Sequence, residues 1–171
     1  VTSSWSDINL CNFYIVAVPT PIDKNKQPNT TALENACTSL GAIIKKGDIV
    51  VFESTVYPGA TEELCVPILK KMSGLRLNID FFVGYSPERI NAGDITHQLG
   101  NLTKIVSATN DNALKIIAKV YQSVLTEPVI IASQIRVAEA AKMYENVQRD
   151  ILIATANQYS DFCREEGIDI K

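Results

Sequence analysis

Phe13-Tyr-Ile-Val-Ala-Val18 is a short, unbroken apolar run that stops at Pro19-Thr-Pro21. Such a run, bounded by turn residues, is typical of a strand that is buried on both faces of a sheet. Ile49-Val-Val-Phe-Glu53 and Phe81-Phe-Val-Gly-Tyr85 have the same character. The sequence therefore predicts three buried strands in its first half.

Helices are predicted between these strands. Thr30 or Thr31 can cap a helix that runs to about Lys45, and a second helix is predicted from Ala60 to Met72. Strands that alternate with helices over short connections form β-α-β units, in which the strands lie parallel. We therefore expect an α/β fold built on a parallel sheet.

The second half of the chain continues this alternation. The expected elements are a strand at 103–107, a helix at 111–123, a strand at 128–131 and a long helix from Ser133 toward Gly167. No Gly-x-Gly-x-x-Gly loop occurs, and residues 1–10 are too few for a first β-α-β unit. We expect a partial Rossmann-like sheet, the second half of a dinucleotide-binding domain, in a piece of a longer protein.

Charge and hydropathy exclude several classes of partner. The net charge is −3, and Lys and Arg form no basic stripe, so nucleic acid and anionic membranes are poor candidates. No stretch approaches the roughly 18 apolar residues that a membrane-spanning helix needs. Val1-Thr-Ser-Ser-Trp5 lacks the charge and apolar run of a signal peptide. A cytoplasmic protein is expected.

The cysteines and the single histidine do not suggest a metal or redox site. Cys11, Cys37, Cys65 and Cys163 are scattered, without the paired spacing of zinc or redox motifs. They are expected to be small buried residues in a reducing compartment. His97 is expected to lie in a loop, and no metal is predicted.

Three polar loops follow the three predicted strands: Pro19-Thr20-Pro21, Ser54-Thr-Val-Tyr-Pro-Gly59 and Ser86-Pro-Glu-Arg89. In open α/β sheets, ligands bind in the crevice beyond the carboxyl ends of the strands. Each loop alone can be explained as turn chemistry. Three in succession at one edge of a sheet indicate a ligand site.

A second polar feature lies on the long helix, in the stretch Ala138-Glu-Ala-Ala-Lys-Met-Tyr-Glu-Asn-Val-Gln-Arg-Asp150. Lys142, Asn146 and Arg149 lie at i, i+4 and i+7, so they project from one face. They could form a solvated stripe, because charged residues are mostly exposed. However, their flanks are rich in Ala and apolar residues, which favours a buried helix. An ammonium, an amide and a guanidinium on one face can surround an oxygen-rich ligand.

Together, the loops and the helix resemble the UDP-glucose/GDP-mannose dehydrogenase family, which oxidises C6 of nucleotide sugars. The matching pieces stand in family order along almost the whole chain: Val18-Pro-Thr-Pro21, Glu53-Ser-Thr-Val-Tyr-Pro-Gly59, Ser86-Pro-Glu-Arg89, and Glu139-Ala-Ala-Lys142 through Asn146 and Arg149. The second and third loops look closest to the branch that acts on UDP-N-acetylhexosamines, which feeds capsule and O-antigen synthesis.

The resemblance implies that NAD is the cofactor. Pro19, Thr20, Ser54 and Thr55 are the implied cofactor-binding residues. Thr20 would lie beside the ribose and pyrophosphate, and Thr55 near the nicotinamide, where it would also take part in catalysis. NAD would carry the hydride, while the protein positions and polarises the reactants.

The resemblance also implies a UDP-sugar substrate. Arg89, Ile90 and Arg149 would contact the sugar nucleotide, and Lys142 and Asn146 would face its C6 atom. Oxidation of an alcohol to an acid passes through oxyanion-like species, which an ammonium and an amide can stabilise. Glu88 would act as a general base through water. All of these groups are expected to enclose one pocket.

Two departures from the family pattern are evident. The family holds its aldehyde intermediate on a cysteine in a motif beyond the last residue of this chain, and Cys163 stands in the wrong context. In addition, Ala92 replaces a proline that is usual in this branch. The isolated chain is therefore expected to be inactive.

The resemblance further implies a division of the chain. Residues 1–132 would be the C-terminal part of the NAD-binding domain, and residues 133–171 the start of a central helical domain that forms a homodimer. Two alternatives stay open. A 6-phosphogluconate or 3-hydroxyacid dehydrogenase also carries Lys and Asn on a helix at this spacing, and a non-catalytic α/β binding module needs no convergence of these residues.

Overall fold

The computed structural model describes residues 2–88 and 103–170. Within them, the strands form one sheet in the order β1 (Phe13–Val16), β2 (Ile49–Phe52), β3 (Phe82–Tyr85), β4 (Ile105–Ala108) and β5 (Ile130–Ile131). β1 pairs with β2, and β2 with β3, in parallel register. The carboxyl ends of these three strands therefore meet at one edge of the sheet, as the sequence predicted.

The second half of the sheet differs from the expected all-parallel arrangement. β4 pairs with β3 in antiparallel register, and β5 lies parallel to β4. β4 and β5 thus run opposite to the first three strands. The β-α-β rule requires parallel strands only where a helix crosses between them, and the sequence predicts no helix between Ser86 and Thr103.

The helices agree with the prediction in order and differ in length. The first, α1 (Thr31–Gly41), ends before Lys45. The second begins as a π-helical turn, η2 (Thr61–Cys65), and continues as α2 (Val66–Ser73). Pro67 lacks an N–H for the α-helical ladder, which accounts for the wider turn before it. α3 (Asp111–Gln122) matches its prediction, while the short 3-10 helix η1 (Trp5–Ile8) was not foreseen.

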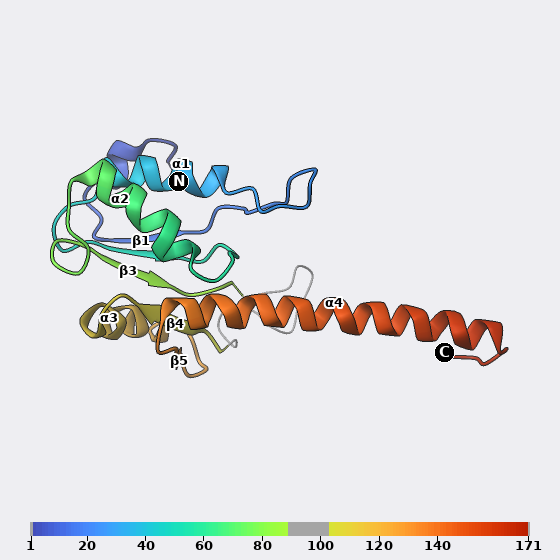
Figure 1. Ribbon diagram of the computed structural model, residues 1–171. Coiled ribbons are helices and arrows are strands. Elements are labelled where there is room, and N and C mark those ends of the chain that lie inside the picture. Colours follow the sequence, from blue (N-terminus) through green and yellow to red (C-terminus); the bar gives the residue numbers. More distant parts are fainter. Residues whose placement is uncertain (1, 89–102, 171) are drawn as a thin grey trace.

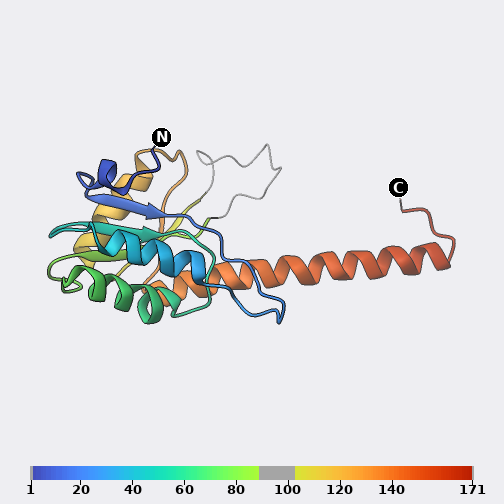
Figure 2. The same cartoon turned by 90° about the horizontal axis from the view of Figure 1, so that it is seen from above.

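The sheet lies between two layers of helices (Figures 1 and 2). Val50 and Phe52 belong to the core on the side of α1 and α2, whereas Ile49 and Val51 pack with Ile117 of α3. This alternation is the two-residue period of a strand buried on both faces. Gly84 allows the close approach of α3, because a Cβ there would lie 2.9 Å from the Ser107 carbonyl oxygen and would collide with Ile117.

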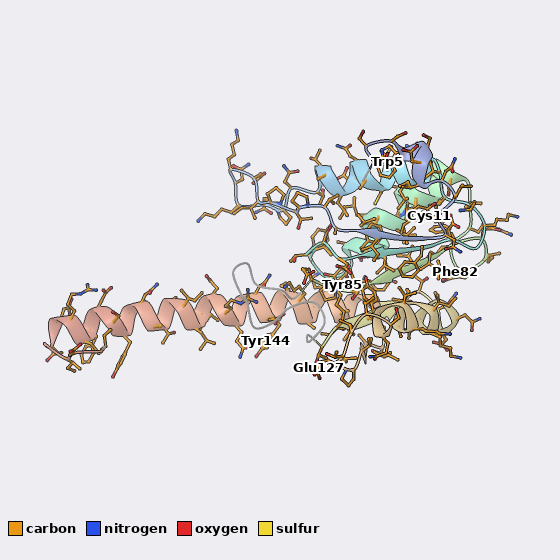
Figure 3. The ribbon with its side chains drawn as sticks, turned by 180° about the vertical axis from the view of Figure 1, so that it is seen from behind. Trp5, Cys11, Phe82, Tyr85, Glu127 and Tyr144 are labelled. Carbon is orange, nitrogen blue, oxygen red and sulfur yellow. The ribbon has the colours of Figure 1, made fainter. Side chains whose placement is uncertain are left out.

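The long helix α4 (Ile135–Glu165) begins and ends within two residues of its predicted bounds. Its first turns are buried: Ile135 and Ala138 join the core on the side of α1 and α2. The remainder extends away from the sheet (Figure 1), and Figure 3 shows Tyr85 near the base of the helix and Tyr144 farther along it. The expected burial therefore holds for the first turns, whereas most side chains beyond Lys142 are exposed and Cys163 is buried there.

The cysteine prediction was right for three residues and wrong for the fourth. Cys37, Cys65 and Cys163 are buried, whereas Cys11 is exposed beside β1. A hydrogen bond with Cys37 and, to a smaller extent, burial raise the pKa of the Cys65 thiol, so this thiol is a poor nucleophile. Within the described residues, no helix is long and apolar enough to cross a membrane.

Candidate functional site

The strand-tip loops are the segments that follow β1, β2 and β3, and hydrogen bonds tie them to one another. The Thr20 hydroxyl donates to the Thr55 carbonyl over 2.5 Å, and the Ser54 hydroxyl donates to the Val18 carbonyl over 2.6 Å. The third loop joins them, because the Glu88 N–H donates to the Glu53 carbonyl at 3.3 Å. Three segments far apart in sequence thus form one rim.

These loops enclose a pocket of about 360 Å³, which we call the strand-tip pocket. Its lining consists of small apolar residues and short polar or acidic ones: Ala17, Val18, Pro19, Thr20, Glu53, Ser54, Thr55 and Glu88. All four predicted cofactor residues and Glu88 therefore lie around one cavity. No lysine or arginine stands among these lining residues, so the pocket is suited to hydroxyl groups or a cationic ring rather than to phosphate.

A buried charged cluster supports the acidic side of this pocket. The Glu53 carboxylate pairs with the Lys104 ammonium at 3.1 Å and accepts a hydrogen bond from the Tyr121 hydroxyl. Lys104 is 2% exposed, also donates to the Pro87 carbonyl at 3.3 Å, and lies 5.3 Å from the centre of the Tyr121 ring. Burial and, to a smaller extent, the negative charge of Glu53 raise the pKa of Tyr121, so its phenol stays protonated.

The sequence analysis missed this cluster. Glu53 was read as the end of a strand, and Lys104 and Tyr121 were assigned no role. The one local signal is a lysine at the edge of an apolar strand, in Thr103-Lys-Ile-Val-Ser107. A lysine there is usually exposed, so its carboxylate partner could be recognised only from the fold.

A second cavity, the helix-side pocket, lies between the strand-tip loops and α4 and measures about 290 Å³. Its lining is mostly apolar. It comes from the first two loops, from the segment just before α1 and from α4: Thr20, Ile22, Pro28, Thr30, Thr55, Val56, Tyr57, Met143, Asn146 and Val147. Thr20 and Thr55 line both pockets. Asn146 therefore lies in the same lining as these two threonines.

Lys142 and Arg149 are arranged differently from Asn146. Lys142 is buried and lines a third pocket, of about 300 Å³, together with Pro87 of the third loop and Ile105. Arg149 is half-buried and lines none of these three pockets. The polar face of α4 therefore spreads over neighbouring cavities instead of enclosing the single pocket that was expected.

Four residues named from the sequence cannot be placed. Arg89 and Ile90, expected to contact the sugar nucleotide, lie outside the described residues, as do Ala92 and His97. Among the residues that are described, no group of three His, Cys, Asp or Glu side chains could hold a metal ion.

Two buried side chains, Tyr85 and Glu139, make hydrogen bonds with the backbone of the loop after β2. The Tyr85 hydroxyl donates to the Ser54 carbonyl at 3.3 Å, and burial, then the charge of Glu139, raises the pKa of Tyr85. Glu139 itself is fully buried and accepts hydrogen bonds from the backbone N–H groups of Gly59 and Thr61. In the sequence, Glu139 stands out only as part of the family motif, and no local pattern indicates these partners.

Comparison with known proteins finds one matching family. Residues 1–125 match the NAD-binding domain of the UDP-glucose/GDP-mannose dehydrogenase family. The chain is 51% identical over 168 residues to UDP-N-acetyl-D-glucosamine 6-dehydrogenase of Pseudomonas aeruginosa, and 54% identical over 168 residues to Protein CapL of Staphylococcus aureus. Each alignment covers 98% of this chain and 40% of the relative.

A solved structure has the same fold. The UDP-D-ManNAc dehydrogenase of Pyrococcus horikoshii superposes with a TM-score of 0.89 at 30% sequence identity. The superposition covers 98% of this chain and 39% of that structure. The chain therefore spans about 40% of the length of the relatives that it matches.

Proposed function

Because the chain belongs to the UDP-glucose/GDP-mannose dehydrogenase family, we propose that the whole protein is an NAD-dependent nucleotide-sugar 6-dehydrogenase. Its substrate would be a UDP-N-acetylhexosamine, whose C6 alcohol is oxidised to a carboxylate for capsule or O-antigen synthesis. The observation that carries this proposal is the pair of pockets that meet at Thr20 and Thr55, one beneath the strand tips and one beside Asn146. The family match favours this reaction over that of a 6-phosphogluconate or 3-hydroxyacid dehydrogenase.

The strand-tip pocket fits the nicotinamide and ribose portion of NAD. Its small lining residues leave room at the carboxyl ends of the parallel strands, where such sheets bind ligands. Its acidic side suits ribose hydroxyl groups and the positive charge of an oxidised nicotinamide. Thr20, Ser54 and Thr55 would contact the cofactor through a rim that their own hydrogen bonds keep in place. NAD, when bound, accepts the hydride.

Residues on α4 would act on the sugar. Asn146 and Lys142 lie one helical turn apart and line neighbouring cavities beside the first two loops and Pro87. An amide and an ammonium can donate hydrogen bonds to the oxygen on C6 as negative charge develops there. Glu88, on the strand-tip pocket, would take a proton through water. Arg89, Ile90 and Arg149 would contact the nucleotide portion.

The number of NADH molecules formed per sugar oxidised can be measured and tests the proposed reaction. Conversion of a primary alcohol to a carboxylate consumes water and transfers two hydrides, so each sugar should yield two NADH. The whole protein, incubated with NAD and UDP-N-acetylglucosamine or its epimers, is expected to produce NADH and the uronic acid in that ratio. NADH formation that stops at one equivalent, or none with any UDP-N-acetylhexosamine, would contradict the proposal.

Lys142 provides a test within the site. The variant Lys142→Ala of the whole protein should lose turnover by about 10² to 10³, the size of effect expected when one donor to a developing oxyanion is removed. Lys115→Ala, at an exposed position on α3, is the control and should leave turnover unchanged. Turnover within twofold of the native value in the Lys142 variant would remove Lys142 from the catalytic set.

The proposal extends to assembly and location. The projecting part of α4 carries exposed apolar side chains at Val147, Ile151, Leu152, Ile153, Tyr159 and Phe162. A patch of this kind supports a homodimer formed through the helix, and hence a second, helical domain that starts at residue 133. Four free cysteines support a reducing compartment, so we place the enzyme in the cytoplasm. Sedimentation of the whole protein at several concentrations would test the dimer.

A further inference from the structure

Glu139 links the long helix to the loop that follows β2. Its side chain is fully buried on α4, one turn before Lys142. One carboxylate oxygen, Oε2, accepts the Gly59 N–H at 2.5 Å, and the other, Oε1, accepts the Thr61 N–H at 2.9 Å. Both donors lie at the start of the helical segment formed by η2 and α2, where backbone N–H groups have no partner within their own helix.

This arrangement satisfies both sides of the contact. A carboxylate taken out of water needs hydrogen bonds to offset the loss of its hydration. Backbone N–H groups at a helix start supply them, and the positive end of the helix dipole favours the negative charge. The contact is directional, because each oxygen has its own donor. It therefore restricts both the rotation of α4 about its axis and its distance from the loop.

The same contact involves the elements that carry the proposed active site. Gly59 closes the loop that bears Ser54 and Thr55, and its φ of +98° is a conformation that suits glycine. On α4, Lys142 and Asn146 follow Glu139 at i+3 and i+7, on the same face. Thr55 and Asn146 line the helix-side pocket together. A turn of α4 that releases Glu139 would move Asn146 away from Thr55.

We propose that Glu139 is a positioning residue: by binding the Gly59 and Thr61 N–H groups, it sets the rotation of α4 and so aligns Lys142 and Asn146 with the loop after β2. This inference rests on the proposed function, since alignment matters to turnover only if these side chains act on a substrate. Glu139 itself lines none of the three pockets described above. Its effect is exerted through the residues that do.

The test compares two carboxylates that join the same two helices. Glu139→Gln keeps the size of the side chain but turns an amide NH₂ toward a backbone N–H, so one of the two hydrogen bonds is lost. Glu63→Gln is the matched control, because Glu63 binds Arg136 of α4 at 2.6 Å in a pair whose side chains are 62% and 54% exposed. Such exposed pairs contribute little.

For Glu139→Gln in the whole protein, kcat is expected to fall on the order of tenfold to a hundredfold, as small misplacements of reacting groups do. The KM for NAD should change less than about threefold, because the loop-to-loop bonds at the strand tips remain. The control should match the native enzyme. A kcat within twofold of native for Glu139→Gln, or an equal loss in the control, would overturn the proposal.

A second variant and an amide-exchange measurement test the proposal if Glu139→Gln does not fold or if the native protein is inactive. If Glu139→Gln fails to fold, Glu139→Asp retains the charge but is one methylene too short to reach both donors, and it should show the same loss of kcat; native turnover would overturn the proposal. If the native protein shows no activity, the proposed function fails separately. Amide exchange at Gly59 and Thr61 then decides: faster exchange in Glu139→Gln supports the contact, and unchanged exchange refutes it.

Discussion

At the amino ends of β2 and β3, Asp48 and Asp80 each have a cationic partner three or four residues away, and Asp80 also has a distant one. Asp48 pairs with Lys45 at 3.2 Å, and Asp80 pairs with Arg76 at 3.0 Å and Lys46 at 3.5 Å. At the carboxyl end of β2, Glu53 instead pairs with Lys104, which begins a strand much later in the chain, and with Tyr121 of α3.

The two ends also differ in what surrounds the charges. The side chains of the cations at the amino end are 48% to 76% exposed, whereas that of Lys104 is almost completely buried. The loops at the carboxyl end line pockets, and none of the three pockets around the candidate site includes Asp48 or Asp80. One end thus pairs its buried carboxylates with partly exposed cations, and the other lines a cavity with a pair in which the cation is buried as well. This contrast predicts unequal responses to mutation.

The largest effect is expected at Lys104. In Lys104→Met, the Glu53 carboxylate keeps its buried position without a cation, which should lower the free energy of unfolding by about 3 to 5 kcal/mol. Urea denaturation of the chain measures this loss. The matched variant at the other end, Lys45→Met, removes a cation whose side chain is 48% exposed, and Asp48 keeps the hydrogen bond from the Lys45 N–H, so a smaller loss is expected there.

A second variant checks the cause. Adding Glu53→Gln to Lys104→Met removes the unpaired charge and should recover much of the lost stability, because replacing both members of a buried pair is far less costly than removing one. Equal losses in Lys104→Met and Lys45→Met would abolish the distinction between the two ends of the sheet.

A smaller effect is expected at the rim of the strand-tip pocket. Thr20→Val removes the hydroxyl that binds the Thr55 carbonyl and frees the two loops from each other. One such hydrogen bond contributes about 0.5 to 1.5 kcal/mol, so NAD should bind the whole protein roughly two- to tenfold more weakly. Calorimetric titration measures this. Thr38→Val on α1, which loses an exposed hydroxyl bond to the Glu34 carbonyl, should leave NAD affinity unchanged.

The contrast between the two ends also explains what the sequence could predict. The strands, the loops after them and the helix that bears Lys142 follow from local periodicity and turn residues, so their order was predicted correctly. That the loops bearing Thr20 and Thr55 lie side by side followed from the rule that parallel strands end at one edge, whereas the place of Asn146 beside them was implied only by the family resemblance. Two of the three pairs at the amino end, Lys45 with Asp48 and Arg76 with Asp80, are equally local, with spacings of three and four residues.

What escaped prediction depends on distant partners. β4 pairs with β3 in antiparallel register, and no local pattern in the sequence encodes that direction. Glu139 and Glu53 bind groups that are far away in sequence, and nothing in their neighbourhoods distinguishes them from exposed glutamates. The single-pocket expectation failed for Lys142 because two residues one helical turn apart can face different cavities.

The smallest effect is expected at Asp80, at the amino end of β3. Hydrogen bonds from the Arg76 side chain and backbone lower the pKa of Asp80 from 3.8 to about 2. A carboxyl group whose pKa is lower in the folded than in the unfolded state stabilises the fold fully above its unfolded pKa. That contribution is lost as the pH falls from about 4 to about 2.

Asp80→Asn removes this acid-sensitive contribution while keeping a side chain of the same shape. Thermal unfolding of both proteins should therefore show a difference in Tm that is constant above about pH 5 and that shrinks between about pH 4 and pH 2. Glu127→Gln, in an exposed turn, should leave the native profile unchanged. A difference that persists undiminished at pH 2 would mean that Asp80 stabilises the fold through its shape and hydrogen bonds and not through its charge.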